Sequence, residues 1–134
     1  MVEFKAVIAD PKTGKCYSRV VSGHHANSLV GKKVGEEIDG IFVGMPGFKL
    51  RITGGTDRQG FPIRPDVPGM RRVRLLVAKS RGFRPKHPGV RRRRMFRANT
   101  IGTDVAQINL KITRYGSKPV EDVLSEKEAS EKGE

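Results

Sequence analysis

The sequence has no tryptophan, a single cysteine, and only six phenylalanines and two tyrosines among 134 residues. A large aromatic-lined ligand pocket is therefore not expected. Cys16 has no second cysteine with which to form an internal disulfide, which agrees with a reducing compartment. The chain also lacks an apolar run of about 18 residues and a leader with an apolar centre, so neither a membrane span nor a secretory signal is expected. We expect one cytosolic domain.

Acidic residues are scarce in the middle of the chain. The whole sequence carries 27 Lys and Arg against 14 Asp and Glu, a formal net charge of +13. Residues 49–97 hold 16 of the basic residues but only Asp57 and Asp66 as acids. Positive charge concentrated in this way attracts polyanions, of which nucleic acid is the commonest. A membrane surface is a poorer candidate, because it requires bulky apolar residues opposite the basic face of a helix, a spacing that residues 91–94 lack.

Patterns typical of enzymes and metal sites are missing as well. Cys16, His24 and His25, with His87 far along the chain, do not have the spacing of metal ligands. No nucleophile is paired with a base in a recognisable pattern. The two glycine-rich motifs that bind nucleotide phosphates, G-x-x-x-x-G-K-[ST] and G-x-G-x-x-G, are both missing. The sequence therefore predicts no catalytic residues, no metal, no cofactor and no small-molecule substrate.

Short segments of alternating polarity predict β-strands. They are found at residues 2–10, 15–22, 48–53, 72–78 and 106–113, and the turn-forming residues 10–14 join the first two into a hairpin. The positions expected to face a core are Phe4, Ala6, Ile8, Phe48, Leu50, Ile52, Ala106, Ile108, Leu110 and Ile112.

These strands predict an all-β fold, a small antiparallel sheet closed or nearly closed into a β-barrel. Residues 1–116 would form the barrel and carry two long basic loops, 54–70 and 79–100. Residues 117–134 would be an acidic tail that is partly helical, because Pro119 is followed by strong helix formers.

The first loop begins with paired glycines. Gly54 and Gly55 would let the backbone pass where a side chain would clash, and Arg58 and Arg64 flank them. The pattern favours contact with a phosphate backbone. The alternative is a plain surface loop that joins two strands.

The second loop lies within a basic track. Every charged side chain of residues 71–97 is positive, and most are arginines, whose planar guanidinium pairs with phosphate and stacks on exposed bases. This composition favours structured RNA, the alternative being a flexible basic segment. Phe83 and Phe96 either stack on bases or anchor the loop back on the barrel, and anchoring on the barrel is favoured. Because of its charge, we expect residues 84–97 to be disordered in the free protein and to order on RNA.

The candidate RNA-binding residues combine both loops with the strand before them. They are Lys49, Arg51, Gly54, Gly55, Arg58, Gln59, Arg64, Arg71, Arg72, Arg74, Lys79, Arg81, Arg84, Lys86, Arg91, Arg92, Arg93, Arg94 and Arg97.

The same segments resemble a known family. The run GGTDRQGFPIRPDV at residues 54–67 is similar to the glycine signature of the eukaryotic and archaeal type of small-subunit ribosomal protein six, with Ile63 where methionine is usual. The family's arginine-rich run is matched from Phe83 to Arg94, and the similarity covers about residues 1–116. The length is like that of archaeal members, so Ser117 and the serines after it should not inherit the regulatory phosphorylation of the longer eukaryotic tail.

The resemblance implies a structural constituent of the small ribosomal subunit in the cytoplasm. Its partners would be ribosomal RNA and neighbouring ribosomal proteins, with no membrane and no catalysis. A free-standing, non-specific DNA or chromatin-binding protein is the alternative, although no helix-turn-helix or zinc-finger pattern is present to enter a groove.

Overall fold

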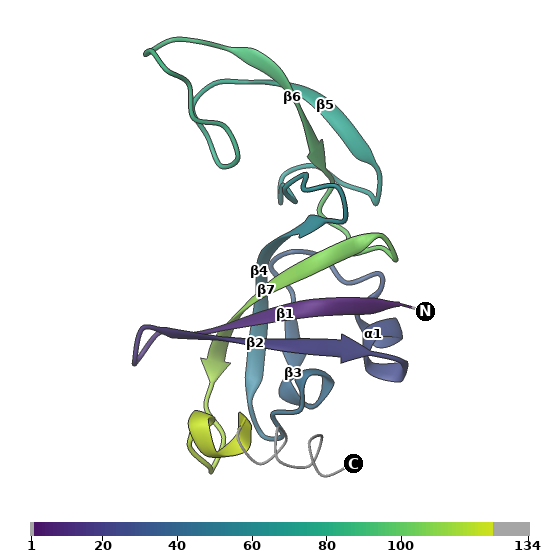
Figure 1. Ribbon diagram of the computed structural model, residues 1–134, viewed down its shortest axis with the longest axis vertical. Coiled ribbons are helices and arrows are strands. Elements are labelled where there is room, and N and C mark those ends of the chain that lie inside the picture. Colours follow the sequence, from purple (N-terminus) through teal and green to yellow (C-terminus); the bar gives the residue numbers. More distant parts are fainter. Residues whose placement is uncertain (1, 125–134) are drawn as a thin grey trace.

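The computed structural model describes residues 2–124 and contains a five-stranded sheet (Figure 1). The order across the sheet is β2-β1-β7-β4-β3. The strands are β1 (Glu3–Asp10), β2 (Lys15–Ser22), β3 (Glu37–Asp39), β4 (Lys49–Asp57) and β7 (Val105–Arg114). The remaining elements are the helix α1 (His24–Leu29), the 3-10 helix η1 (Gly40–Val43) and the strands β5 (Arg72–Val77) and β6 (Arg92–Arg97).

The predicted barrel is wrong, because the sheet is open. β2 pairs only with β1, β3 pairs only with β4, and no ladder joins these two edge strands. The sheet is also not purely antiparallel, since β1 lies parallel to β7. α1 and η1 contact each other and β2. The guanidinium of Arg19 on β2 donates to the carbonyl of Val43 in η1, so helical residues stand where a closing strand pair would be needed.

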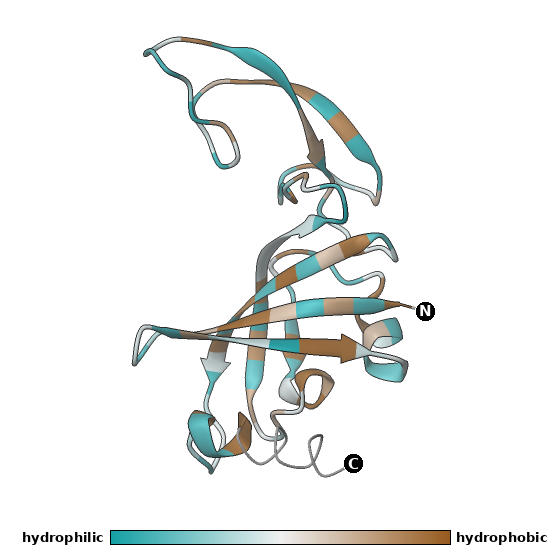
Figure 2. Ribbon diagram, viewed as in Figure 1, coloured by the Kyte–Doolittle hydropathy of each residue, from teal (hydrophilic) through white to brown (hydrophobic). Residues whose placement is uncertain are grey.

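The core lies against one face of this sheet. Phe4, Ile8, Leu50 and Leu110 are at most 1% exposed, as the two-residue period of half-buried strands requires. Every other position expected to face inward is also buried except Ala106, which is half-buried. Figure 2 shows the resulting alternation of apolar and polar bands along β1 and β7.

The predicted hairpin of residues 2–10 and 15–22 is confirmed by the β1–β2 ladder. Its turn is fixed by Asp10, whose carboxylate accepts hydrogen bonds from the Lys12 backbone and the Thr13 hydroxyl. The Tyr115 hydroxyl donates to the same carboxylate from beyond the end of β7. The first hairpin is thereby attached to the strand beside it.

The C-terminal helix is observed in part. Residues 120–124 are helical, and Val120, Val123 and Leu124 are buried in the main core. The start of the predicted acidic tail therefore packs against the body of the molecule. Its continuation from residue 125 lies outside the described residues.

A second, two-stranded sheet projects from one end of the main sheet (Figure 1). We call residues 72–97 the arm: β5, β6 and the connection 78–91 between them. The predicted loop 79–100 thus contains the strand β6, and the predicted loop 54–70 begins inside β4. β6 could not be predicted from periodicity, because its sequence RRRMFR does not alternate apolar and polar residues. Its pairing with β5 holds these residues in a strand.

The arm has a small apolar cluster of its own. Val77, Phe83 and Phe96 are buried together, with Leu75 packed against them. The connection folds back so that Phe83 reaches this cluster. The prediction that both phenylalanines anchor the loop on the body of the protein is wrong: both rings are buried, but in the cluster of the arm itself and not in the main core.

Candidate nucleic-acid interface

The arm carries most of the candidate residues in exposed positions. Within the described residues, the following basic side chains are exposed and have no carboxylate partner: Arg74, Lys79, Arg81, Arg84, Lys86, Arg91, Arg92, Arg93 and Arg94. Arg71, immediately before β5, is exposed in the same way. Nothing within residues 2–124 neutralises these charges, and their repulsion favours an anionic partner.

Strand pairing distributes the arginines over both faces of the arm. Successive residues of a strand point to opposite faces, and directly opposed residues share a face. Arg92 and Arg94 lie opposite Val77 and Leu75, on the face of the phenylalanine cluster. Arg93 lies opposite Leu76 on the other face. The arm is therefore positively charged on both sides, and no single flat partner would neutralise it.

Two candidate arginines are engaged within the fold at the base of the arm. Arg72 and Arg97 oppose each other in the ladder, an unfavourable arrangement for like charges unless each has a counter-ion. The Nε of Arg72 donates to Asp57 at 2.7 Å, and the guanidinium of Arg97 donates to Asp104. Arg97 is only 2% exposed. These two arginines hold the arm on the main sheet, and Arg97 is too deeply buried to reach a partner.

Asp57 organises the turn that leads to the arm. Its Oδ1 accepts the backbone N–H groups of Gln59 and Phe61, and its Oδ2 accepts the Arg72 hydrogen bond. Burial by itself raises the pKa of Asp57, but the hydrogen bonds from Arg72, Phe61 and Gln59 outweigh it and hold the pKa below the usual 3.8. In the sequence Asp57 stands out as a rare acid and as part of the glycine signature, and its role in the turn was not predicted, although an aspartate that starts a glycine-containing turn is a known signal of such hydrogen bonding.

The paired glycines have different surroundings. A Cβ on Gly55 would lie 2.3 Å from the carbonyl oxygen of Gln107 on β7, whereas a Cβ on Gly54 would meet nothing within 4 Å. Gly55 is buried and permits the close approach of β4 and β7. Its position is therefore explained by strand packing. Gly54, which is partly exposed, remains a candidate for contact with a phosphate backbone.

The other candidates lie outside the arm. Lys49 and Arg51 are exposed at the start of β4, the end of that strand farther from the arm in Figure 1. Arg58 and Gln59 are exposed in the turn after β4. Arg64 is half-buried: its Nε donates to Asp66 at 2.7 Å, and its guanidinium lies over the Phe96 ring at 5.4 Å. The candidate residues thus form one large group on the arm and a smaller group along β4.

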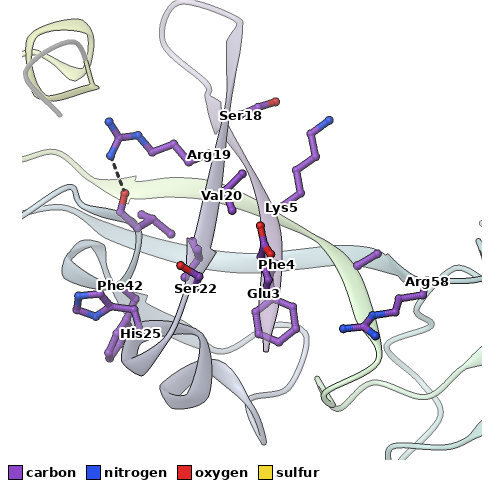
Figure 3. Close-up of a pocket in the computed structure, with 13 residues that line it drawn as sticks. Glu3, Phe4, Lys5, Ser18, Arg19, Val20, Ser22, His25, Phe42 and Arg58 are labelled. Carbon is purple, nitrogen blue, oxygen red and sulfur yellow. Dashed lines mark hydrogen bonds between the residues drawn. The ribbon is translucent and has the colours of Figure 1, made fainter. Parts of the chain in front are cut away.

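A hollow of about 750 Å³ lies beside β1 and β2 (Figure 3). Its polar side chains do not converge on one point: Arg58 lies on one side of the two strands, and His25 with Phe42 lies on the other. Arg19 is engaged by the carbonyls of Val43 and Leu124. This arrangement does not resemble a catalytic or small-molecule site.

Among residues 2–124, no helix is both long and apolar enough to cross a membrane. No group of three or more His, Cys, Asp or Glu side chains in the same part of the chain could hold a metal ion.

Comparison with known proteins gives consistent matches. The family described as ribosomal protein S6e matches residues 4–125. The small ribosomal subunit protein eS6 of Archaeoglobus fulgidus is 48% identical over 128 residues, covering 95% of this chain and 99% of the relative. The protein of the same description from Methanocaldococcus jannaschii is 50% identical over 120 residues, covering 90% of this chain and 89% of the relative.

Proposed function

The chain belongs to the ribosomal protein S6e family, and from that premise we propose that its arm binds small-subunit ribosomal RNA and neutralises its phosphates. The family is one of ribosomal structural proteins and not of enzymes. Its members named above are proteins of the small ribosomal subunit, so the chain is located in the cytoplasmic ribosome. We infer that its partners there are ribosomal RNA and neighbouring ribosomal proteins. The proteins would contact surfaces of the chain outside the arm.

One observation carries the proposal: nine exposed basic side chains on the arm have no acidic partner among residues 2–124. RNA helices packed together in a ribosome repel one another through their phosphates. A narrow two-stranded arm with arginines on both faces can lie between such helices and lower that repulsion. The clamp at its base, made by Arg72 with Asp57 and Arg97 with Asp104, fixes the direction in which the arm points.

The alternative of a free-standing DNA or chromatin-binding protein has less support. The helices α1, with six residues, and η1, with four, are too short to serve as a recognition helix, and the helical residues 120–124 bury Val120, Val123 and Leu124 in the main core. α1 and η1 also pack against the body of the protein beside β2. Membership of a ribosomal family favours RNA as the polyanion.

The proposal is tested by neutralising the arginine run on the arm. We expect the variant R91Q/R92Q/R93Q/R94Q to bind small-subunit RNA with a weaker salt dependence. The slope of log affinity against log salt concentration should fall by roughly three to four units, because each lost phosphate contact lowers that slope by about one unit. The variant should also fail to remain on small subunits through a high-salt wash, measured by co-sedimentation.

A matched control removes four positive charges elsewhere. Lys5, Lys33, Lys111 and Arg114 are exposed and lie outside the arm. K5Q/K33Q/K111Q/R114Q should change the salt slope by less than about one unit and should still sediment with small subunits. Equal effects of the two quadruple variants would show that overall charge, and not the arm, determines binding.

A further inference from the structure

One face of the arm exposes apolar side chains between arginines. Leu76 is 63% exposed and Met95 is 40% exposed. They are diagonal neighbours, because Leu76 opposes Arg93 and Met95 opposes Arg74. We call these four residues, Arg74, Leu76, Arg93 and Met95, the Leu76 face. Long side chains at diagonal positions of a ladder can reach each other, so the two apolar groups form one small patch with a cation on either side.

The opposite face of the arm is already filled. Val77, Phe83 and Phe96 are buried there, with Leu75 packed against them. Arg94 lies over the Phe83 ring at 5.4 Å. The two phenylalanines of the arm, Phe83 and Phe96, are buried, and its one exposed ring is that of His87, which lies in the connection 78–91 and not on the Leu76 face. The Leu76 face is therefore the apolar surface that the arm leaves available to a partner.

We propose that the Leu76 face lies in the minor groove of double-helical RNA, with Leu76 and Met95 against the riboses and Arg74 and Arg93 on the phosphates of the two strands. The inference rests on the proposed function and names the form of RNA that the arm recognises. It concerns duplex RNA, and not unpaired bases.

The lack of exposed rings on the two strands of the arm favours a duplex. Proteins that bind single-stranded RNA on a sheet stack the unpaired bases on exposed aromatic side chains of the strands, whereas the one exposed ring of the arm, His87, lies in the connection between β5 and β6. The major groove of A-form RNA is deep and narrow, and side chains cannot read it. The minor groove is wide and shallow and displays base edges on its floor and 2′-hydroxyls along its sides, where the C–H groups of the riboses also provide apolar surface.

The surrounding charge favours RNA over a protein as the occupant. From residue 71 to residue 97 the chain contains no Asp or Glu, and both flanking residues of the patch are arginines. A protein surface that covered Leu76 and Met95 would have to desolvate Arg74 and Arg93 as well, which is costly unless carboxylates are supplied in register. The phosphates on either side of a minor groove supply negative charge at regular spacing.

The first test uses the unmodified protein. Its affinity is measured at one salt concentration for an RNA duplex of about 16 base pairs, for one strand of that RNA and for a DNA duplex of the same sequence. We expect the RNA duplex to bind at least about tenfold more tightly than either of the others. Equal or tighter binding of the single strand or of the DNA duplex would overturn the inference.

The second test removes the apolar patch without changing charge. L76S/M95S should weaken binding to the RNA duplex about tenfold, because partial burial of two large apolar side chains is lost. The slope of log affinity against log salt should stay the same, since no phosphate contact is removed. The matched control is V20S/I41S, which alters two exposed aliphatic side chains, 65% and 55% exposed, outside the arm and should leave affinity unchanged. Circular dichroism checks the folding of both variants.

The outcomes separate this inference from the proposed function. If R91Q/R92Q/R93Q/R94Q leaves the salt slope unchanged, the arm does not bind RNA and both proposals fail. If that slope falls but L76S/M95S binds the RNA duplex like the unmodified protein, only the minor-groove inference fails. Loss of L76S/M95S from small subunits with unchanged RNA affinity would likewise overturn the inference and assign the Leu76 face to a neighbouring protein.

Discussion

The Nε of Arg72 lies 2.7 Å from Oδ2 of Asp57, which joins the first residue of β5 to the last residue of β4. The Asp57 side chain is fully buried, and the Arg72 side chain is 30% exposed. The contact therefore sits at the junction between the main sheet and the arm. It converts one arginine of the basic track from a possible phosphate ligand into a fixed attachment point, so that the arginines farther along the arm are presented in a defined direction.

Removing the charge of Asp57 should destabilise the protein. We expect D57N to lower the free energy of unfolding by about 2 kcal/mol, because Arg72 loses its counter-ion in a largely buried position. The measurement is urea unfolding at pH 7. D66N is the matched control, since Asp66 pairs with Arg64 but its side chain is 62% exposed; its effect should stay within about 0.5 kcal/mol. Equal effects would mean that the buried position of Asp57 has no special energetic role.

The strands were predictable where a single period was present. Residues 2–10, 48–53 and 106–113 alternate apolar and polar side chains, and all three form strands of the main sheet. The arrangement of those strands was not predictable in the same way. β1 pairs in parallel with β7, about 100 residues away, and no local pattern marks such a contact. The short helix α1 spans only six residues, too few for a helical period to be visible in the sequence. It packs beside β2, an edge strand of the open sheet, and beside η1.

The positive charge of the candidate interface was predictable from the sequence. Which of its basic residues are exposed and which are held within the fold was not. Residue types identified the basic track, yet Arg93 and Arg97 are chemically identical in the sequence. Only the fold places Arg97 against Asp104 and leaves Arg93 exposed. Gly55 is a similar case: its neighbour across the sheet, Gln107, cannot be identified from local sequence.

The two glycines at 54 and 55 should respond differently to substitution. In G55A the new methyl group would meet the carbonyl oxygen of Gln107, so β4 and β7 would have to move apart. We expect a loss of about 2 kcal/mol in the free energy of unfolding. G54A should change it by less than about 1 kcal/mol, because no atom lies within 4 Å of the added carbon. Thermal and urea unfolding of the pair provide the measurement, and a more severe effect at Gly54 would contradict the packing explanation.

Stability should fall in acid. Hydrogen bonds hold the pKa of Asp57 below 3.8, although burial alone would raise it, and the Tyr115 hydrogen bond in particular lowers the pKa of Asp10. A carboxyl group whose native pKa is depressed stabilises the fold above its unfolded pKa and loses that contribution as pH drops through the native value. The free energy of unfolding should therefore be steady from about pH 5 to 7 and decline below about pH 4.

Y115F provides the check on this pH dependence. Without the Tyr115 hydroxyl, the pKa of Asp10 should move up toward its ordinary value. Y115F should then be less stable than the unmodified protein near pH 7, and the difference should shrink as pH falls and Asp10 becomes protonated in both. Urea unfolding from about pH 2.5 to pH 7 would measure it. A difference that is independent of pH would contradict the role assigned to Asp10.

The arm should be the least protected region in the free protein. A two-stranded hairpin is marginal on its own, and this one carries strong like-charge repulsion. We expect weak hydrogen-exchange protection at residues 84–97 without RNA and increased protection with RNA. F83A should lower the protection of the arm further, because Phe83 belongs to its apolar cluster, and leave the amides of β1 and β7 unchanged. Strong protection of residues 84–97 in the free protein would contradict this expectation.

Variants of two arginines of β6 should distinguish the attachment of the arm to the main sheet from the binding of RNA. Arg97 is 2% exposed and donates to Asp104, whose side chain is half-exposed, so R97Q should destabilise the fold by about 2 kcal/mol, because a buried side chain loses its charge-assisted hydrogen bond and part of its packing. Arg93 is exposed with no carboxylate partner among residues 2–124, so R93Q should change stability by less than about 0.5 kcal/mol.

RNA titrations at several salt concentrations should give the opposite ranking of the two variants. R93Q should lower the salt slope by about one unit, whereas R97Q, measured at a temperature where it is folded, should keep the slope of the unmodified protein. If R97Q alone lowered the slope, Arg97 would have to leave Asp104 on binding, and the clamp at the base of the arm would open when RNA is bound.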